Sequence, residues 1–93
     1  MIEIRRSEKD RHFEPGDILR HFKHEINKFG YIYRVIGIAK HTESGQDLLI
    51  YQDVHSEQIY ARPLEMAMSE VDKNKYPNIK QKYRFEKINW EEM

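Results

Sequence analysis

The sequence predicts a mainly β protein, a small antiparallel β-barrel with at most one short helical turn. Its clearest element is a hairpin over residues 31–54, where an aromatic and β-branched run and a shorter apolar run flank a polar turn. Short strand-like segments separated by turn residues recur along the chain. They are too close together for crossover helices, which excludes a parallel sheet. Closure into a barrel removes the hydrogen-bonding edges of an open sheet.

The length of 93 residues indicates a single domain. Residues 1–10 are highly charged and poor in apolar side chains, so we expect a disordered N-terminal tail. Residues 11–88 are expected to form the barrel domain, and residues 89–93 a C-terminal tail.

The first half of the domain is expected to place one strand before the hairpin. Pro15 and Gly16 favour a turn over residues 13–17, because proline presets φ and glycine accepts the left-handed region. Residues 18–23 are expected to form the first strand, with Leu19 and His21 on one face. Residues 24–30 form a loop that Gly30 closes.

The hairpin is expected to be the centre of the barrel. Its turn covers residues 41–47, and Gly45 supplies the positive φ of a hairpin loop. Gly37 inside the first run predicts a bend or a close backbone approach. The apolar residues expected to be mostly buried are Val35, Ile36, Ile38, Leu49 and Ile50.

The second half is expected to add two strands and one helical turn. A turn over residues 54–58 leads to a strand over residues 59–62, and Pro63 then starts a helical turn over residues 63–66. We expect this turn to run into a strand, although the spacing of Leu64, Met68 and Val71 also fits a longer helix. Residues 72–78 form a polar loop, and residues 83–88 a closing edge strand.

Composition excludes several classes of protein. The sixteen basic and sixteen acidic residues balance, which argues against a general polyanion binder. Cysteine is absent, so disulfides, thiolate metal sites and thiol nucleophiles are excluded. No apolar run approaches the length of a membrane helix, and no signal peptide is evident at the start. We therefore expect a cytoplasmic protein with no membrane partner.

The chain carries a set of short motifs in a fixed order: Arg20-His21-Phe22-Lys23, Tyr33-x-Val35-x-Gly37-x-Ala39-x-His41 with Glu43 in the turn, Tyr51, and Arg62-Pro63-Leu64-Glu65-Met66. Together they resemble the motifs of the domain of unknown function 1653 family. The resemblance runs from about Pro15 to Ile88 and keeps the order of the motifs. It implies a small bacterial SH3-like β-barrel domain, found alone or fused to others, with no established activity. The chain differs in its longer loop after Lys23, and in Val54-His55-Ser56 where the family commonly has Leu-Tyr-Gly.

Catalytic and metal-binding arrangements are poorly supported. His21 and His24 lie on opposite faces of a strand, and no third metal ligand is close in sequence. His41, Ser44 and Asp47 have the residue types of a nucleophilic site, but a tight turn gives Ser44 no strained elbow. Hydrogen bonding of Ser44 to the turn backbone explains it better. We expect no enzyme activity, no metal and no cofactor.

The motif residues themselves form the main candidate site, a ligand groove. Alternation along neighbouring strands would place several of them on one face, where arginine forks bind carboxylates or phosphates and tyrosines offer flat apolar contact. The alternative is structural, with Arg62 pairing with Glu65 or capping a sheet edge, and with Tyr51 and Tyr60 packing on the barrel. The candidate groove residues are Arg20, His21, Lys23, Arg34, His41, Tyr51, Tyr60, Arg62 and Glu65.

A second candidate is the basic segment over residues 73–87, which has six basic residues, one acid and three aromatic residues. This composition is typical of nucleic-acid contacts, with cations for phosphates and rings for bases. The alternative is an exposed edge strand whose lysines prevent aggregation. The candidate nucleic-acid residues are Lys73, Lys75, Tyr76, Lys80, Lys82, Tyr83 and Arg84.

The function predicted from the sequence is that of a non-catalytic binding or accessory module. Its expected partner is a protein, a peptide, a nucleotide or another small anionic ligand. Weak nucleic-acid binding through residues 73–87 is the alternative.

Overall fold

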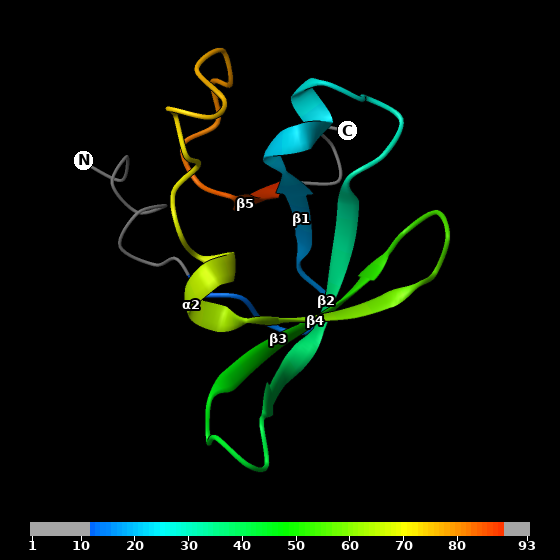
Figure 1. The fold of residues 1–93 in the computed structure, drawn as a ribbon. Coiled ribbons are helices and arrows are strands. Elements are labelled where there is room, and N and C mark those ends of the chain that lie inside the picture. Colours follow the sequence, from blue (N-terminus) through cyan, green and yellow to red (C-terminus); the bar gives the residue numbers. More distant parts are fainter. Residues whose placement is uncertain (1–11, 89–93) are drawn as a thin grey trace, which may run out of the picture.

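The computed structural model describes residues 12–88, so the predicted tails at residues 1–10 and 89–93 lie outside the described part. The elements in chain order are β1 (Ile18–His21), the 3₁₀ turn η2 (Phe22–Glu25), β2 (Ile32–Lys40), β3 (Asp47–Asp53), β4 (Ile59–Pro63), the helical turn α2 (Leu64–Ala67) and β5 (Phe85–Ile88). Figure 1 shows the long β2–β3 hairpin at the centre of this arrangement.

The strands form one antiparallel five-stranded sheet in the order β4-β3-β2-β1-β5. This confirms the predicted fold class, a mainly β, barrel-like sheet with one short helix, and its strand order is compatible with an SH3-like barrel. Strands β4 and β5 stand at the two ends of the sheet, and within residues 12–88 no backbone ladder joins them. Side chains link them instead, because the Tyr51 ring lies against both Tyr60 of β4 and Phe85 of β5.

Strand β1 is shorter than the expected strand over residues 18–23, because the chain turns into η2 after His21. The imidazole of His21 explains the end of the strand. Its Nδ1 accepts a hydrogen bond from the backbone N–H of Lys23 at 3.1 Å, which caps the start of η2. The motif residues Phe22 and Lys23 therefore lie on a helical turn and not on a strand.

The β2–β3 hairpin has the predicted turn, with Gly45 at φ 76°. The predicted irregularity at Gly37 is a β-bulge, since the register shifts between Val35 and Gly37. The bulge leaves Ile36 as the extra residue without a partner in the ladder. Ile36 is 44% exposed, so its predicted burial was wrong.

The far half of the hairpin extends away from the other elements (Figure 1). Ile38 faces the same way as its buried partner Leu49, yet it lies beyond the core and is 43% exposed. Its predicted burial was also wrong, whereas Val35 and Leu49 are fully buried as expected. Ile50 is half-buried.

The hydrophobic core lies between the concave side of the sheet and α2. Its main cluster comprises Phe13, Leu19, Val35, Leu49, Tyr51, Ala67 and Phe85. A smaller cluster of Phe22, Val71 and Ile79, with Tyr76 packed against it, lies under η2. Together the two clusters pack the segment between α2 and β5 against the rest of the domain.

The predicted helical turn after Pro63 is confirmed, and the predicted strand after it is reduced to one bridge between Glu70 and Tyr83. Strand β5 starts at Phe85, two residues later than expected. The loop before it is held by Gln81, which is 5% exposed. Its amide donates to the carbonyls of Arg20 and Tyr83 and accepts from Arg20 Nε at 3.0 Å. The Gln81 side chain thus supplies hydrogen bonds that fix the loop next to β1, where a regular strand would form backbone hydrogen bonds.

Candidate functional site

A cluster of rings and two arginines fills the space between the two end strands of the sheet. We name it the aromatic–arginine cluster. Its members are His21, Tyr33, Tyr51, Tyr60, Arg62, Arg84 and Phe85. Phe85 is its buried centre, with ring centroids 5.0 Å from His21, 5.2 Å from Tyr51 and 5.8 Å from Tyr33.

The strand register explains why these rings meet. His21 stands opposite Phe85 across β1 and β5, and Tyr51 stands opposite Tyr60 across β3 and β4. Directly opposed residues share a face of the sheet, so each pair projects into the same space. Tyr51 and Tyr60 are stacked with centroids 5.6 Å apart, and Tyr60 remains 43% exposed. The cluster thus has a buried floor and one open ring face.

The two arginines are half-buried beside this floor. Arg62 donates from Nε to the Tyr51 hydroxyl at 3.2 Å and from Nη1 to Met66 Sδ at 3.5 Å. Nε of Arg84 is shielded from solvent and has no hydrogen-bond partner within residues 12–88. Among the described residues neither arginine forms an ion pair with a carboxylate.

The electrostatics of the cluster reflect this concentration of positive charge. Burial, and after it the charges of Arg84, Arg62 and Lys23, lower the pKa of His21 to about 4. His21 is therefore neutral near neutral pH, with Nδ1 as acceptor and the remaining ring proton on Nε2. Burial and then the charge of Arg62 lower the pKa of Arg84. The two guanidinium groups thus act on one another and on His21.

The hydroxyl of Tyr33 keeps its proton near neutral pH. Burial, followed by the charge of Asp53, raises the pKa of Tyr33 to about 12. A neutral hydroxyl both donates and accepts hydrogen bonds. Chemically, the cluster offers two guanidinium groups for an anion and an exposed tyrosine face for a flat apolar group.

Four of the nine candidate groove residues belong to this cluster, namely His21, Tyr51, Tyr60 and Arg62. Two others lie elsewhere on the sheet. Arg20 donates to Gln81, and the exposed Arg34 donates to Gln52 at 3.4 Å, on the side facing away from the core.

The remaining three candidates lie around the edges of the molecule. His41 is in the β2–β3 turn, where Nδ1 accepts from the backbone N–H groups of Glu43 and Ser44. Lys23 lies over the Tyr76 ring. Glu65 is exposed on α2, and the guanidinium of Arg62 contacts Tyr51 and Met66 rather than this carboxylate.

Three members of the cluster were missing from the predicted groove: Tyr33, Arg84 and Phe85. Tyr33 had a signal, since it alternates with the buried Val35 along β2. Arg84 was assigned by composition to the basic segment. Its position directly before β5, where its carbonyl accepts from the N–H of Phe22, could not be recognised before the β1–β5 pairing was known.

The basic segment of residues 73–87 is mostly a loop with turns, and a regular strand starts only at Phe85. Lys73 Nζ donates to the carbonyl oxygens of Ile79 and Gln81. Lys75 lies over the ring of Tyr76, which packs edge-on against Phe22, and Lys82 lies over the ring of Tyr83. Lys80 is exposed, and its backbone N–H donates to Glu25.

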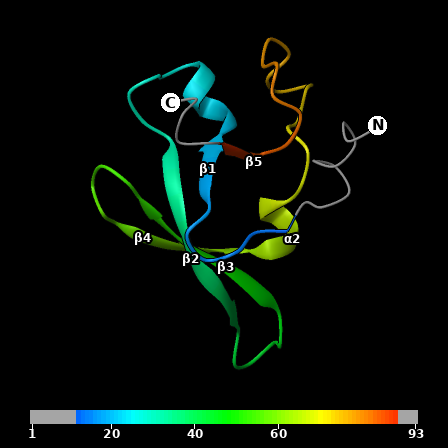
Figure 2. The same cartoon turned by 180° about the vertical axis from the view of Figure 1, so that it is seen from behind.

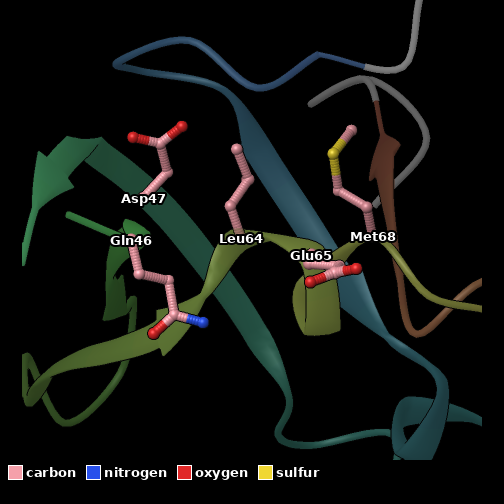
Figure 3. A pocket seen from close by; sticks show the side chains of 5 residues that line it. All are labelled: Gln46, Asp47, Leu64, Glu65 and Met68. Atoms are coloured by element: carbon pink, nitrogen blue, oxygen red, sulfur yellow. The ribbon is translucent and has the colours of Figure 1, made fainter. Parts of the chain in front are cut away.

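A separate hollow of about 310 Å³ lies between α2 and the start of β3. Figure 3 shows its lining by Gln46, Asp47, Leu64, Glu65 and Met68. Of the candidate groove residues only Glu65 lines it. Asp47 is 2.7 Å from the ammonium group of Lys40, so part of the acidic charge is already neutralised. The hollow and the aromatic–arginine cluster therefore share no lining residue.

Within residues 12–88, no group of three or more His, Cys, Asp or Glu side chains could hold a metal ion. Ser44 Oγ accepts a hydrogen bond from the backbone N–H of Gln46 at 3.1 Å. No helix among the described residues is both long enough and apolar enough to cross a membrane.

Comparison with known proteins gives one match. A family model described as "Protein of unknown function (DUF1653)" matches residues 17–87, which is most of the chain and includes every member of the aromatic–arginine cluster. No curated protein matches the chain. No solved structure matches it either.

Proposed function

Because the chain belongs to the DUF1653 family of unknown function, which supplies no activity to transfer, we propose a function from the geometry. The domain acts as a non-catalytic binding or accessory module that recognises an anionic group on a peptide, nucleotide or other partner. The observation that supports this is the position of Arg62 and Arg84, beside an aromatic floor and without a carboxylate partner among residues 12–88.

A bound anion would relieve an unfavourable arrangement. Half-buried guanidinium groups lose water, and a like charge nearby raises the free energy of both. In folded proteins such groups are normally paired with carboxylates. A carboxylate or phosphate between Arg62 and Arg84 supplies the missing counter-charge, and arginine forks match the geometry of both anions.

The tyrosines add a second element of recognition. Tyr60 is stacked on Tyr51 and presents its other side to solvent. Tyrosine at a binding surface contributes a large apolar contact with one polar end. A partner with an anionic group next to an aromatic or other flat group therefore fits the cluster better than a bare anion does.

Binding measurements on matched variants test the proposal. The ligands are inorganic phosphate, adenosine monophosphate and a short acidic peptide containing tyrosine, and binding is followed by NMR chemical-shift changes. We expect shifts at His21, Tyr60 and Arg84, and a loss of affinity of tenfold or more in Arg62→Gln, since a hydrogen bond to a charged group contributes about 1.5–3 kcal/mol.

The matched control is Arg34→Gln, which removes an exposed arginine on the opposite side of the sheet. It should leave affinity unchanged. Equal losses in the two variants would mean nonspecific attraction of anions. Absence of shifts around the cluster with all three ligands would refute the proposal.

Weak nucleic-acid binding through residues 73–87 is the competing function, supported by the exposed ammonium groups of Lys75 and Lys80. It predicts affinity for oligonucleotides that falls steeply with salt, and a flatter salt dependence in the Lys80→Ala, Lys82→Ala double variant. We also propose that the domain is bacterial and cytoplasmic and that its barrel is SH3-like. The strand order supports the SH3-like architecture.

A further inference from the structure

In the loop between η2 and β2, polar side chains form hydrogen bonds within the loop and apolar side chains are exposed to solvent. Its polar residues bond the loop itself, since His24 Nδ1 donates to the carbonyl of Gly30 at 2.8 Å and Asn27 Oδ1 accepts from the N–H of Phe29 at 3.1 Å. Its apolar residues face solvent, with Phe29 90% exposed and Ile26 66% exposed. An ordered loop that presents two apolar side chains to water indicates a contact surface.

Exposed lysines occur in this loop and in the loop after α2, and carboxylates of the same region accept hydrogen bonds from the backbone. Glu25 accepts from the N–H groups of Lys80 at 2.9 Å and Gln81 at 2.7 Å. Burial opposes the ionised form, but these hydrogen bonds, with the charges of Arg20 and Lys73, lower the pKa of Glu25. The Glu25 carboxylate is therefore ionised and bound to the backbone of Lys80 and Gln81.

The loop after α2 contributes to the same end. Asp72 is also used locally, because its carboxylate accepts from the N–H groups of Asn74 and Lys75. The Phe22 and Tyr76 rings join the two loops at 4.8 Å, and Figures 1 and 2 both show the loops at the end opposite the β2–β3 turn. The exposed cations that accompany Phe29 and Ile26 are Lys28, Lys75 and Lys80.

We propose that this end of the domain docks onto an anionic lipid surface, with Phe29 and Ile26 entering the headgroup region and Lys28, Lys75 and Lys80 facing the lipid phosphates. Peripheral attachment requires apolar side chains at a protruding tip and cations around them. Both are present here. The proposal concerns a surface distinct from the aromatic–arginine cluster and does not depend on anion binding there.

Other occupants fit this surface less well. A nucleic acid would use the lysines and could stack on Phe29, but it gives the aliphatic Ile26 no comparable contact. A stable protein interface needs about 800 Å² on each partner with a packed apolar centre. Two side chains on a loop tip offer only a small apolar area. A bilayer does not need a complementary shape, so a small apolar tip can enter it.

This surface differs from what the sequence predicted, which was no membrane partner. That expectation depended on the lack of a long apolar run. Two apolar residues three positions apart in a polar loop leave no such signal, and their exposure became evident only in the folded loop.

Co-sedimentation with vesicles tests the proposal on the full chain. The vesicles contain phosphatidylglycerol and phosphatidylcholine in equal parts, with phosphatidylcholine alone for comparison. We expect binding to the anionic vesicles at low salt, weakened by added salt, and at least tenfold weaker binding by Phe29→Ser. Ile59→Ser is the matched control, because Ile59 is 52% exposed on β4, and it should bind like the parent.

Two further readouts separate the possible outcomes. A blue shift of emission in Phe29→Trp on addition of anionic vesicles, relative to the parent protein, would support insertion. The proposal is overturned by absence of vesicle binding at low salt, or by binding that Phe29→Ser leaves unchanged. Binding to oligonucleotides without binding to vesicles would also overturn it and assign this end to nucleic acid.

Discussion

Two regions of this domain combine cations with aromatic rings, and they use them differently. In the loop over residues 72–82, two ammonium groups contact the loop itself: Lys73 donates to two carbonyls, and Lys75 lies over the ring of Tyr76. In the aromatic–arginine cluster, within residues 12–88, Arg84 Nε has no hydrogen-bond partner, and Arg62 bonds a hydroxyl and a thioether sulfur. Part of the loop's charge is thus used by the loop, whereas the cluster leaves two guanidinium groups without an anion among the described residues.

The comparison shows that basic and aromatic composition alone does not identify a binding site. Both regions combine basic with aromatic residues, which lie close together in the sequence in the loop and come from distant segments in the cluster. What distinguishes them is the partner of each nitrogen atom, which depends on strand pairing. The following experiments test that distinction, starting with the largest expected effect.

The aromatic floor should be far more important for stability than the ring in the loop. Phe85 is fully buried, so Phe85→Ala should lower the free energy of unfolding by about 3–5 kcal/mol. Tyr76 is half-buried, and Tyr76→Ala should cost roughly 1–2 kcal/mol. Urea denaturation of the two variants measures both losses. Similar losses would mean that the loop is as integral to the core as the cluster.

Acid should destabilise the protein through His21. The folded-state pKa is about 4, compared with 6.5 for a free imidazole, so between these values the unfolded chain takes up a proton that the folded protein does not. Stability therefore falls as pH falls through this interval, by roughly 1–3 kcal/mol. NMR titration of the imidazole measures the pKa directly. In His21→Asn, which keeps an acceptor for capping η2, this part of the pH dependence should disappear.

We expect Lys73 to contribute to the stability of the fold and Lys80 to have little effect on it. Lys73→Met removes an ammonium group that donates to two carbonyls and should cost about 1 kcal/mol. Lys80→Met removes an exposed ammonium group and should change stability by less than about 0.5 kcal/mol. Thermal unfolding of the pair, with identical changes in charge, gives the comparison. Equal effects would contradict the structural role assigned to Lys73.

Much of the fold could be predicted from the sequence because local patterns carry it. The hairpin, its Gly45 turn, the irregularity at Gly37 and the helical turn after Pro63 all depend on neighbouring residues. The exposure of Ile36 and Ile38 could not be predicted. A bulge changes which side chains of a strand point to the core, and distant elements determine how far the core extends along the hairpin.

The candidate site was predictable only in part, for a similar reason. His21, Tyr51, Tyr60 and Arg62 were grouped as motif residues, and the sheet brings them together. Phe85 joins them through the pairing of β5 with β1, a contact between residues more than sixty positions apart, and Arg84 directly precedes it in the chain. Nothing in the sequence near Arg84 indicates that its Nε is buried while the neighbouring Lys82 is exposed.

The most direct test of the central claim is the stability of Arg84→Met, measured by urea denaturation beside Arg34→Met. Methionine keeps an apolar stem and removes a guanidinium group that lies near Arg62 with its Nε unpaired. If Arg84 is held ready for a ligand, its charge contributes nothing to the fold, and both variants should match the parent within about 0.5 kcal/mol, with Arg84→Met equal or more stable. A loss above about 2 kcal/mol in Arg84→Met alone would show that its guanidinium supports the fold, and would contradict the claim.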